Sequence, residues 1–276
     1  MKISIVIAVS NDLRIEKTIK SVDEDVEIVV SLNEPTENIK KLIYKLKKEN
    51  PNIKTCTIPY LSIAGAYNHA IKHSSYDNIL LMDSDCVFEK GCIKRLYKNL
   101  KNNKLSKGNI VFTNNNWMEK IVALSREFHT SDFLNAYSPP LLFKKNIKDD
   151  IGGYYFHPAL CWMEDGEFDF RVQNAKLKIS YDPDAKIYHD ALTFKKDLKS
   201  AFNYGLGRRI SAELKIDKKP TGLIKGLSKY LLPGIKKKGF CVGIYLYIWR
   251  IVILFGYNYQ RIFHIKKYDQ KYETLK

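Results

Sequence analysis

The sequence predicts an α/β fold: a mostly parallel, Rossmann-like central sheet flanked by helices, followed by a basic helical C-terminal appendage. Over the first 115 residues, short runs rich in Ile and Val alternate with stretches whose apolar residues recur every three or four positions. This alternation of strands and helices is typical of a doubly wound sheet. Positive charge is concentrated near the C-terminus, because residues 195–276 hold 19 Lys and Arg against 5 Asp and Glu. An apolar run, residues 239–256, lies within that basic part.

Each element of the first half follows from its apolar spacing. β-branched runs predict strands, and polar residues such as Ser10, Asn11 and Thr36 provide turn or N-cap chemistry before the helices that follow. The expected strands are residues 3–8, 26–31, 53–58, 79–82 and 109–113. The expected helices are residues 15–22, 36–46 and 93–100, with one more that starts near residue 64.

The pattern is less regular after residue 115. Residues 117–129 predict a helix, and residues 178–189 predict a strand, a turn and a second strand that ends in a histidine. Between them, residues 131–156 contain two adjacent prolines and two adjacent glycines, which favours mobile loops around a site.

Length and cysteine content narrow the class of protein. A chain of 276 residues fits one large α/β domain with an appendage or two smaller domains. The five cysteines are scattered without Cys-x-x-Cys spacing, which indicates a reducing compartment. The apolar run at the N-terminus is shorter than a signal peptide requires. We therefore expect a cytoplasmic protein.

Two carboxylates follow the fourth predicted strand. Asp83 and Asp85 are separated by one residue and come directly after the apolar run 79–82. Ligands of open α/β sheets bind beyond the carboxyl ends of strands, and carboxylate oxygens suit Mg²⁺ and Mn²⁺. The pair therefore predicts a metal site, while a solvated loop that caps the next helix is the simpler alternative.

A second acidic pair and a late histidine are further candidates. Glu164 and Asp165 precede an amphipathic segment, so Asp165 is either a general base or the cap of a helix. Arg171 either braces these acids or makes a surface salt bridge. His189 is either an ordinary polar residue or a ligand that completes the site of Asp85, since imidazole is acceptable to Mn²⁺.

Taken in order, these segments resemble the family 2 glycosyltransferases of the glycosyltransferase-A (GT-A) fold. The resemblance covers residues 1–195 and rests on ISIVIAVSND, EIVVSLNEPTE, AGAYNHAI, ILLMDSD and MEDGEFDFRVQNAKLKISYDPDAKIYH. The last block is the most specific, because an acid pair, an arginine, a strand, an Asp-Pro turn and a terminal histidine follow one another as they do in that family.

The resemblance implies a metal, a base and a donor site. Asp83 and Asp85 would hold Mn²⁺ or Mg²⁺ on the diphosphate of a nucleotide-sugar, with Asp85 as the direct ligand and His189 as a further candidate ligand. Asp165 would be the catalytic base, and Glu164 would help to position the acceptor. The positions that match donor contacts are Ala8, Ser10, Asn33, Glu34, Gly65, Asn68, Asp83 and Ser84.

The resemblance also implies an organisation and a reaction. Residues 1–195 would form the catalytic domain, with a nucleotide-sugar half over 1–115 and an acceptor half over 116–195, and residues 196–276 would form the basic helical region. The reaction would be inverting transfer to an acceptor hydroxyl. Where the family often has Asp-Asp-Gly-Ser or Asp-Asn-Gly-Ser, this chain has Ser31-Leu32-Asn33-Glu34. The choice among UDP-, GDP- and dTDP-sugars therefore stays open.

The apolar run 239–256 suggests contact with a membrane. It has the minimum length for a spanning helix but carries Arg250, which is costly in hydrocarbon. We expect a helix that lies on an anionic membrane surface, with nearby lysines at the lipid and Tyr245, Tyr247, Trp249 and Tyr257 at the headgroups. A spanning helix and an ordinary buried helix are the alternatives. Attachment to the cytoplasmic face of the plasma membrane suits a glycan or lipid-linked acceptor in polysaccharide or glycolipid assembly.

Two other functions are compatible with parts of the sequence. A polyprenyl-phosphate glycosyltransferase would share the fold but need little help from a base. A non-catalytic basic protein would bind lipid or nucleic acid through its tail, although the chain has no RNA-recognition or zinc-finger signature, so we expect no nucleic-acid partner. A homo-oligomer is neither required nor excluded by the sequence.

Overall fold

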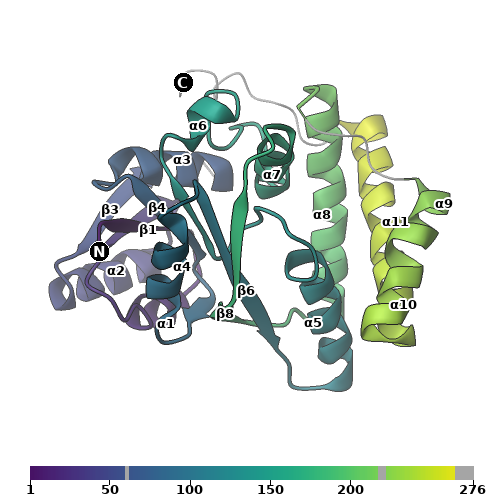
Figure 1. Cartoon of the computed structure of the whole chain (residues 1–276), viewed down its shortest axis with the longest axis horizontal. Coiled ribbons are helices and arrows are strands. Elements are labelled where there is room, and N and C mark those ends of the chain that lie inside the picture. Colours follow the sequence, from purple (N-terminus) through teal and green to yellow (C-terminus); the bar gives the residue numbers. More distant parts are fainter. Residues whose placement is uncertain (60–61, 217–221, 265–276) are drawn as a thin grey trace. The chain divides into compact units, whose positions relative to one another are not determined.

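The structure is a computed structural model that describes residues 1–59, 62–216 and 222–264 (Figure 1). The chain divides into two compact units. The first unit comprises Met1–Val111, Leu134–His157 and Phe168–His189. The second comprises Phe112–Phe133, Pro158–Glu167 and Asp190–Lys276. The second unit therefore includes two segments that come from before residue 190. The functional halves expected within residues 1–195 stay a prediction.

Four parallel strands form the N-terminal half of the sheet. They lie in the order β3-β2-β1-β4 and pair in register along their length. Their bounds are Ile3–Val9 for β1, Glu27–Asn33 for β2, Ile53–Ile58 for β3 and Asn78–Asp83 for β4. The alternating strands and helices expected over this half are confirmed.

The other half of the eight-stranded sheet continues in the order β7-β6-β8-β5. Here β4 pairs with β7, β6 with β7, and β5 with β8, all antiparallel. The sheet is therefore mixed, and its parallel character is confined to one half. The bounds are Cys86–Phe88 for β5, Leu105–Thr113 for β6, Leu141–Lys144 for β7 and Ile179–Asp190 for β8.

Two expectations for these strands are wrong. The segment expected to be irregular contains β7, and β8 runs without interruption through Pro183, where the sequence predicted a turn. Backbone pairing with neighbouring strands, which the local sequence does not reveal, accounts for both differences.

The helices begin at caps that the sequence provides. The side chains of Thr36, Ser62 and Asn116 accept hydrogen bonds from the backbone N–H groups of Ile39, Gly65 and Glu119, which satisfies donors at the first turn. The helices of the first part of the chain are α1 (Ile15–Lys20), α2 (Glu37–Glu49), α3 (Ile63–His73), α4 (Cys92–Leu100), α5 (Trp117–Thr130), α6 (Ile147–Asp150) and α7 (Glu164–Asn174).

The core of the first unit lies between the sheet and helices that include α3. Val6, Val29 and Leu81 project from adjacent parallel strands and pack with Tyr67 and Phe168. Burial of these apolar side chains is the main favourable term that holds the strand ends in place.

The second unit is helical. It contains α5 together with α8 (Phe194–Glu213), α9 (Leu223–Gly226), a short π-helix (Leu227–Leu231), α10 (Leu232–Lys238) and α11 (Phe240–Phe263). Helices α8 and α11 run side by side (Figure 1). They approach closely at two glycines, since a Cβ atom on Gly205 would lie 2.2 Å from the Ile253 carbonyl oxygen and one on Gly256 would lie 2.2 Å from that of Phe202.

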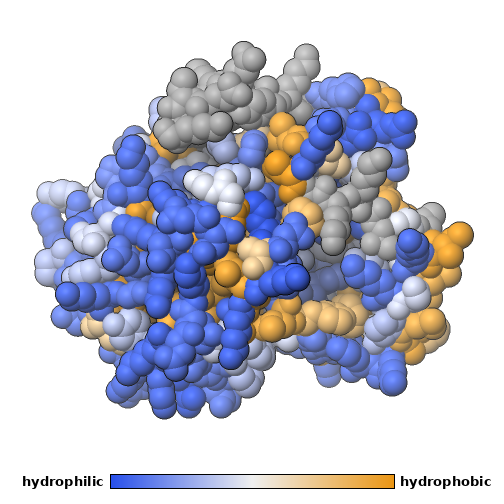
Figure 2. All heavy atoms as spheres, turned by 45° about the horizontal axis from the view of Figure 1, so that its top comes forward, coloured by the Kyte–Doolittle hydropathy of each residue, from blue (hydrophilic) through white to orange (hydrophobic). Residues whose placement is uncertain are grey.

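Helix α11 has a buried face that carries both apolar and polar side chains, and it also has exposed apolar residues. Arg250 is 2% exposed and Tyr245 and Tyr257 are also buried, so the expectation that these two tyrosines lie at lipid headgroups is wrong. Lys238 pairs with Glu127 and Asp132 of the same unit. The exposed hydrophobic residues of α11 are Phe240, Ile244, Ile248, Ile251, Phe255, Ile262 and Phe263. Figure 2 shows hydrophobic surface at the edge where Figure 1 places α9 to α11.

Candidate active site

The carboxyl ends of three parallel strands bring the first predicted site residues together. Asp83 is the last residue of β4 and stands opposite Ala8 of β1, which stands opposite Ser31 of β2. Neighbouring residues of paired strands point to the same face of a sheet. The position of Asp83 at a strand end is therefore confirmed, and the register places it beside Ala8.

Asp85 and His189 meet beyond this edge. Strand β5 begins directly after Asp85 and pairs antiparallel with β8, with Cys86 opposite His189. As a result, Nε2 of His189 lies 3.2 Å from Oδ2 of Asp85. The two side chains come from distant parts of the sequence, and the antiparallel pairing explains their contact.

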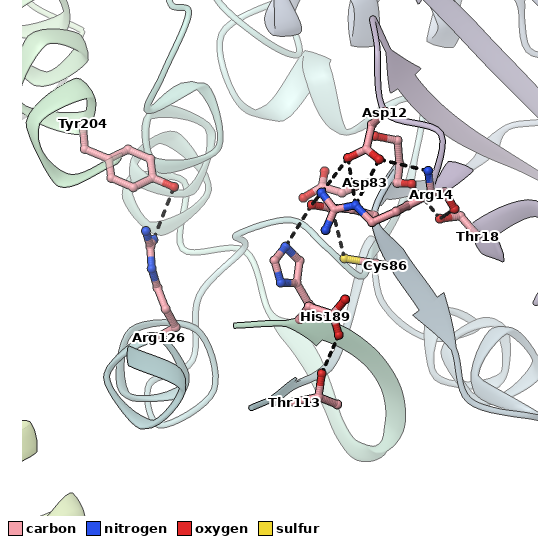
Figure 3. Close-up of polar contacts among 12 residues, drawn as sticks. Asp12, Arg14, Thr18, Asp83, Cys86, Thr113, Arg126, His189 and Tyr204 are labelled. Atoms are coloured by element: carbon pink, nitrogen blue, oxygen red, sulfur yellow. Dashed lines mark hydrogen bonds and ion pairs between the residues drawn. The ribbon is translucent and has the colours of Figure 1, made fainter. Parts of the chain in front are cut away.

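Arg14 is a site residue that the sequence analysis missed. Its Nη2 atom lies 2.9 Å from Asp85 Oδ2 and 2.6 Å from Asp12 Oδ2 (Figure 3). Arg14 precedes α1, in the turn that follows β1. The available signal was therefore a lone arginine in the first strand-to-helix turn, which is where α/β folds bind phosphates.

The two carboxylates of the site differ in their pKa values. Burial, and next the charge of Asp85, raise the pKa of Asp83, while a 2.7 Å hydrogen bond from the hydroxyl of Tyr67 opposes the rise. Burial also acts to raise the pKa of Asp85, but the hydrogen bond and charge of His189, helped by Arg14, outweigh it and lower that pKa. Asp85 is therefore the stronger acid of the two, which suits a direct metal ligand.

The side chains around Asp85 include atoms that could bind a divalent cation. Ligand atoms of Asp85, Cys86 and His189 all lie within 4.8 Å of one another. Burial and the two neighbouring carboxylates hold the pKa of Cys86 well above its ordinary value, so this residue stays a thiol. The remaining carboxylate and imidazole form a donor set that Mn²⁺ accepts more readily than Mg²⁺.

The residues expected at the nucleoside lie at the ends of β1 and β2. The Ser10 hydroxyl donates to the Glu34 carbonyl oxygen at 3.2 Å, and the Asn33 amide oxygen accepts from the Ser62 backbone N–H at 3.1 Å. The carbonyl oxygen of Ser84 accepts a bond from the Thr18 hydroxyl at 2.9 Å. The structure thus joins Ser10 to Glu34 and ties Asn33 to the start of α3, while their contacts with a donor stay a prediction.

Gly65 and Asn68 lie on α3 and have structural partners. The Gly65 N–H donates to the Ser62 cap at 3.0 Å. The Asn68 side chain donates to the Phe156 carbonyl at 2.7 Å and accepts from the Phe156 N–H at 3.1 Å. Asn68 therefore anchors the segment that precedes residue 157, and a role for these two residues at the donor stays a prediction.

The second acidic pair belongs to the second unit. Glu164 and Asp165 begin α7, and Asp165 Oδ1 accepts a 2.7 Å bond from the Gly166 N–H. Burial raises the pKa of Tyr204; the Arg126 charge opposes this, and the charges of Asp165 and Glu164 add to the rise. The acids therefore lie near the half-buried Tyr204, whose hydroxyl accepts a 3.5 Å hydrogen bond from Arg126 (Figure 3). The convergence of Asp165 with Asp85 stays a prediction.

Two further residues define the surroundings of α7. Arg171 donates to the carbonyls of Ile151 and Tyr154, each at 2.8 Å, and of Tyr155, so it holds that segment in place. A Cβ atom on Gly207 of α8 would lie 2.3 Å from the carbonyl oxygen of Trp162. Helix α8 thus packs directly on the backbone that leads into the acidic pair.

Comparison with known proteins identifies the family. The sequence model of the family described as glycosyl transferase family 2 matches residues 4–164. No curated protein matches the sequence.

Solved structures with the same fold include two glycosyltransferase systems. S. aureus TarS 1-349 aligns with a TM-score of 0.57 and 18% identity over 86% of this chain and 73% of that chain. Its complex with UDP-GlcNAc aligns with a TM-score of 0.56 and 15% identity over 93% and 89%. The mannosyltransferase PcManGT from Pyrobaculum calidifontis, in complex with GDP-Man and Mn²⁺, aligns with a TM-score of 0.65 and 12% identity over 96% and 88%. Because the family model covers more than half of the residues and these structures share the GT-A fold, the chain belongs to glycosyl transferase family 2 and is a glycosyltransferase.

Proposed function

We propose that this enzyme is an inverting, metal-dependent glycosyltransferase that moves a sugar from a nucleotide-sugar to an acceptor hydroxyl. The observation that carries the proposal is the 3.2 Å contact between Asp85 and His189 at the carboxyl edge of the parallel strands, beside Asp83. Family membership and the nucleotide-sugars bound by TarS and PcManGT support such a donor. The donor nucleotide is UDP, GDP or dTDP.

In the proposed donor site, a metal ion and the side chain of Arg14 would both contact the diphosphate of the nucleotide-sugar. Asp85 and His189, with Asp83 beside them, would hold Mn²⁺ or Mg²⁺, and PcManGT was solved with Mn²⁺. A bound cation would act as a Lewis acid that offsets the negative charge of the leaving diphosphate. Arg14, which contacts Asp85, has the planar fork that binds phosphate oxygens in pairs. It would therefore bind the same diphosphate.

The proposed base is Asp165, with Glu164 positioning the acceptor. A carboxylate within hydrogen-bond reach of the acceptor hydroxyl takes its proton as the new glycosidic bond forms. Attack from the face opposite to the nucleotide breaks the bond to the diphosphate and inverts the anomeric centre. This step needs Asp165 to approach the donor held at Asp85.

The acceptor is proposed to lie at a membrane. Helix α11 is long and apolar enough to span one, but 44% of its most apolar window is buried, and Arg250 faces the interior of the second unit. Its exposed Ile and Phe residues instead suit a helix that lies in the lipid interface. We assign the enzyme to polysaccharide or glycolipid assembly on the cytoplasmic face of the plasma membrane.

Substitution of the proposed base tests the reaction. In Asp165→Asn, kcat should fall about 10²- to 10⁴-fold with little change in donor KM. Asp169→Asn on the same helix is the matched control, because an amide oxygen can still accept the bonds from the Ala136 N–H and the Gln173 side chain. Equal losses in both variants would contradict the assignment of Asp165.

A panel of donors tests the metal and the nucleotide. UDP-, GDP- and dTDP-sugars are compared by thermal shift with and without Mn²⁺, since a ligand that binds only the native state raises the melting temperature. One nucleotide should give a shift that depends on Mn²⁺ or Mg²⁺. Shifts that are the same after removal of divalent metal would overturn metal dependence.

A polyprenyl-phosphate acceptor is the second candidate, and the exposed apolar face of α11 favours it. A phosphate oxygen is already ionised at neutral pH, so it needs little help from a base. Near-normal turnover of Asp165→Asn with polyprenyl phosphate would support this candidate. A purely non-catalytic binding role is not supported, because the family assignment makes the chain an enzyme.

A further inference from the structure

A second group of metal-ligating side chains lies on the first unit, away from the proposed active site. Cys56 of β3 and His69 and His73 of α3 place one ligand atom each within 4.8 Å of the other two. The cysteine is buried, His69 is half-buried and His73 is exposed. We propose that these three residues bind a zinc ion.

The backbone explains why the three side chains meet. His69 and His73 are four residues apart on one helix, so they project from the same face. Their ring centroids are 4.3 Å apart. Helix α3 packs across β2 and β3, which brings this face of the helix over Cys56.

The hydrogen bonding of His73 leaves a suitable nitrogen for a metal. Its Nδ1 atom lies 2.8 Å from the backbone carbonyl oxygen of His69. A carbonyl can only accept, so Nδ1 carries the proton and Nε2 keeps its lone pair. Metal-binding histidines commonly donate their other N–H to a backbone carbonyl in this way, which fixes the ring orientation.

The surroundings of Cys56 suit a coordinated thiolate. Ser31 stands opposite Cys56 in the register of β2 and β3, and its side chain is fully buried. Burial raises the pKa of the Cys56 thiol, and the nearby Ser31 hydroxyl opposes that rise. Within the described parts of the chain, this hydroxyl has no other hydrogen-bond partner. A thiolate at Cys56 would give this hydroxyl an acceptor and so lower the cost of burying both groups.

One sulfur and two imidazoles are the donor set of zinc, and hard cations such as Mg²⁺ bind it poorly. Binding of Zn²⁺ displaces the thiol proton to solvent and forms one Zn–S and two Zn–N bonds. Three protein ligands and the exposure of His73 leave a fourth tetrahedral position open to water.

The strand register separates this site from the proposed active site. Asp83, Ala8, Ser31 and Cys56 stand side by side on β4, β1, β2 and β3. Three strand spacings correspond to about 14 Å. Helix α3 nevertheless serves both, because its Tyr67 bonds to Asp83 while its two histidines face Cys56. Zinc would therefore fix the helix that orients Asp83.

Metal analysis of the untagged full-length chain tests the proposal. We expect about one zinc per chain after growth with zinc and dialysis, and a thiolate-to-metal charge-transfer band when Co²⁺ replaces it. Cys56→Ser should abolish the band, and Cys56→Ser and His73→Gln should each weaken zinc binding at least tenfold. The exposed position of His73 keeps the test valid if Cys56→Ser fails to fold.

Matched variants distinguish the proposed zinc site at Cys56 from the proposed metal site at Asp85. Cys92→Ser removes another buried cysteine, while Cys86→Ser and His189→Ala alter the group at Asp85; all three should keep the zinc and the band. Loss of the band in Cys86→Ser with retention in Cys56→Ser would overturn the proposal. Absence of a thiolate band, or unchanged zinc affinity in His73→Gln, would overturn it as well.

Discussion

The imidazole of His189 contacts the carboxylate of Asp85, at 3.2 Å, because Cys86 and His189 are paired residues of two antiparallel strands. The contact lowers the pKa of Asp85 against the opposing effect of its burial. It also brings together two of the side chains that we propose as metal ligands.

Removal of this histidine should therefore weaken metal binding. In His189→Ala, we expect the Kd for Mn²⁺ to rise at least about 10-fold, because loss of even a supporting partner of a metal ligand costs about 10- to 100-fold in affinity. Mn²⁺ titration followed by electron paramagnetic resonance measures this Kd. Tyr188→Phe is the control, because the neighbouring Tyr188 hydroxyl bonds to Glu89; a similar loss in that variant would point to damage of β8.

Tyr67 should set the ionisation of Asp83. Its hydrogen bond opposes the rise in the pKa of that half-buried carboxyl, so Tyr67→Phe should raise the pKa further. If the ionised form is the active one, the acid limb of the kcat/KM profile should move to higher pH, with a loss of about 10-fold or more below that limb. An unchanged profile would show that Asp83 does not titrate in the reaction. Tyr155→Phe, which removes a bond to the Lys145 carbonyl, is the control.

Glu27 should make the stability of the first unit depend on pH. Burial alone would raise its pKa, but hydrogen bonds from Lys54, Ser4 and Ser75 outweigh burial and lower the pKa to about 2. The pKa of Glu27 in the folded chain is below that of an unfolded glutamate. The ionised Glu27 therefore stabilises the folded state fully above about pH 4.5, and this stabilisation is lost as the pH falls toward 2. The contribution is roughly 3 kcal/mol at most.

Denaturant unfolding at several pH values measures this contribution. Glu27→Gln should unfold more easily at neutral pH, and its free energy of unfolding should change less between pH 4.5 and 2 than that of the wild type. Glu49→Gln removes an exposed ion pair with Lys45 and should change little. Parallel pH curves for the wild type and Glu27→Gln would refute the assignment.

The close contact of α8 and α11 should not tolerate a side chain at Gly205. A Cβ atom there would lie 2.2 Å from the Ile253 carbonyl, so Gly205→Ala must push the helices apart. We expect a loss of about 1–3 kcal/mol, as for other overpacked sites, measured by thermal or urea unfolding. Gly222→Ala, which meets nothing within 4 Å, is the control, and equal stability of the two variants would contradict this packing.

The sequence predicted those parts of the site that depend on local pattern. Asp83 lies at a strand end because an apolar run stops there, and Thr36 caps a helix because its hydroxyl reaches the first turn. These features need only a few neighbouring residues. The alternation of strands and helices over the parallel half follows in the same way.

Features that depend on distant pairing were harder to predict. The contact of His189 with Asp85 requires β5 and β8 to be neighbours, and the sequence alone offered His189 only as a candidate. Arg14 was missed because nothing in its own turn shows that Asp85 lies beside it. Likewise, the apolar run 239–256 predicted an apolar helix, but the packing of α11 against α8 decided which of its side chains are exposed to solvent.

Helix α8 links the proposed base to the proposed lipid contact. Its Gly205 abuts α11, and its Gly207 abuts Trp162, just before Glu164 and Asp165. If α11 lies on a bilayer, the packing of α8 against α11 and Trp162 would fix the distance between Asp165 and the lipid surface. The enzyme would then prefer acceptors whose hydroxyl lies at one fixed distance from the lipid anchor. Acceptors with shorter or longer spacers would react more slowly.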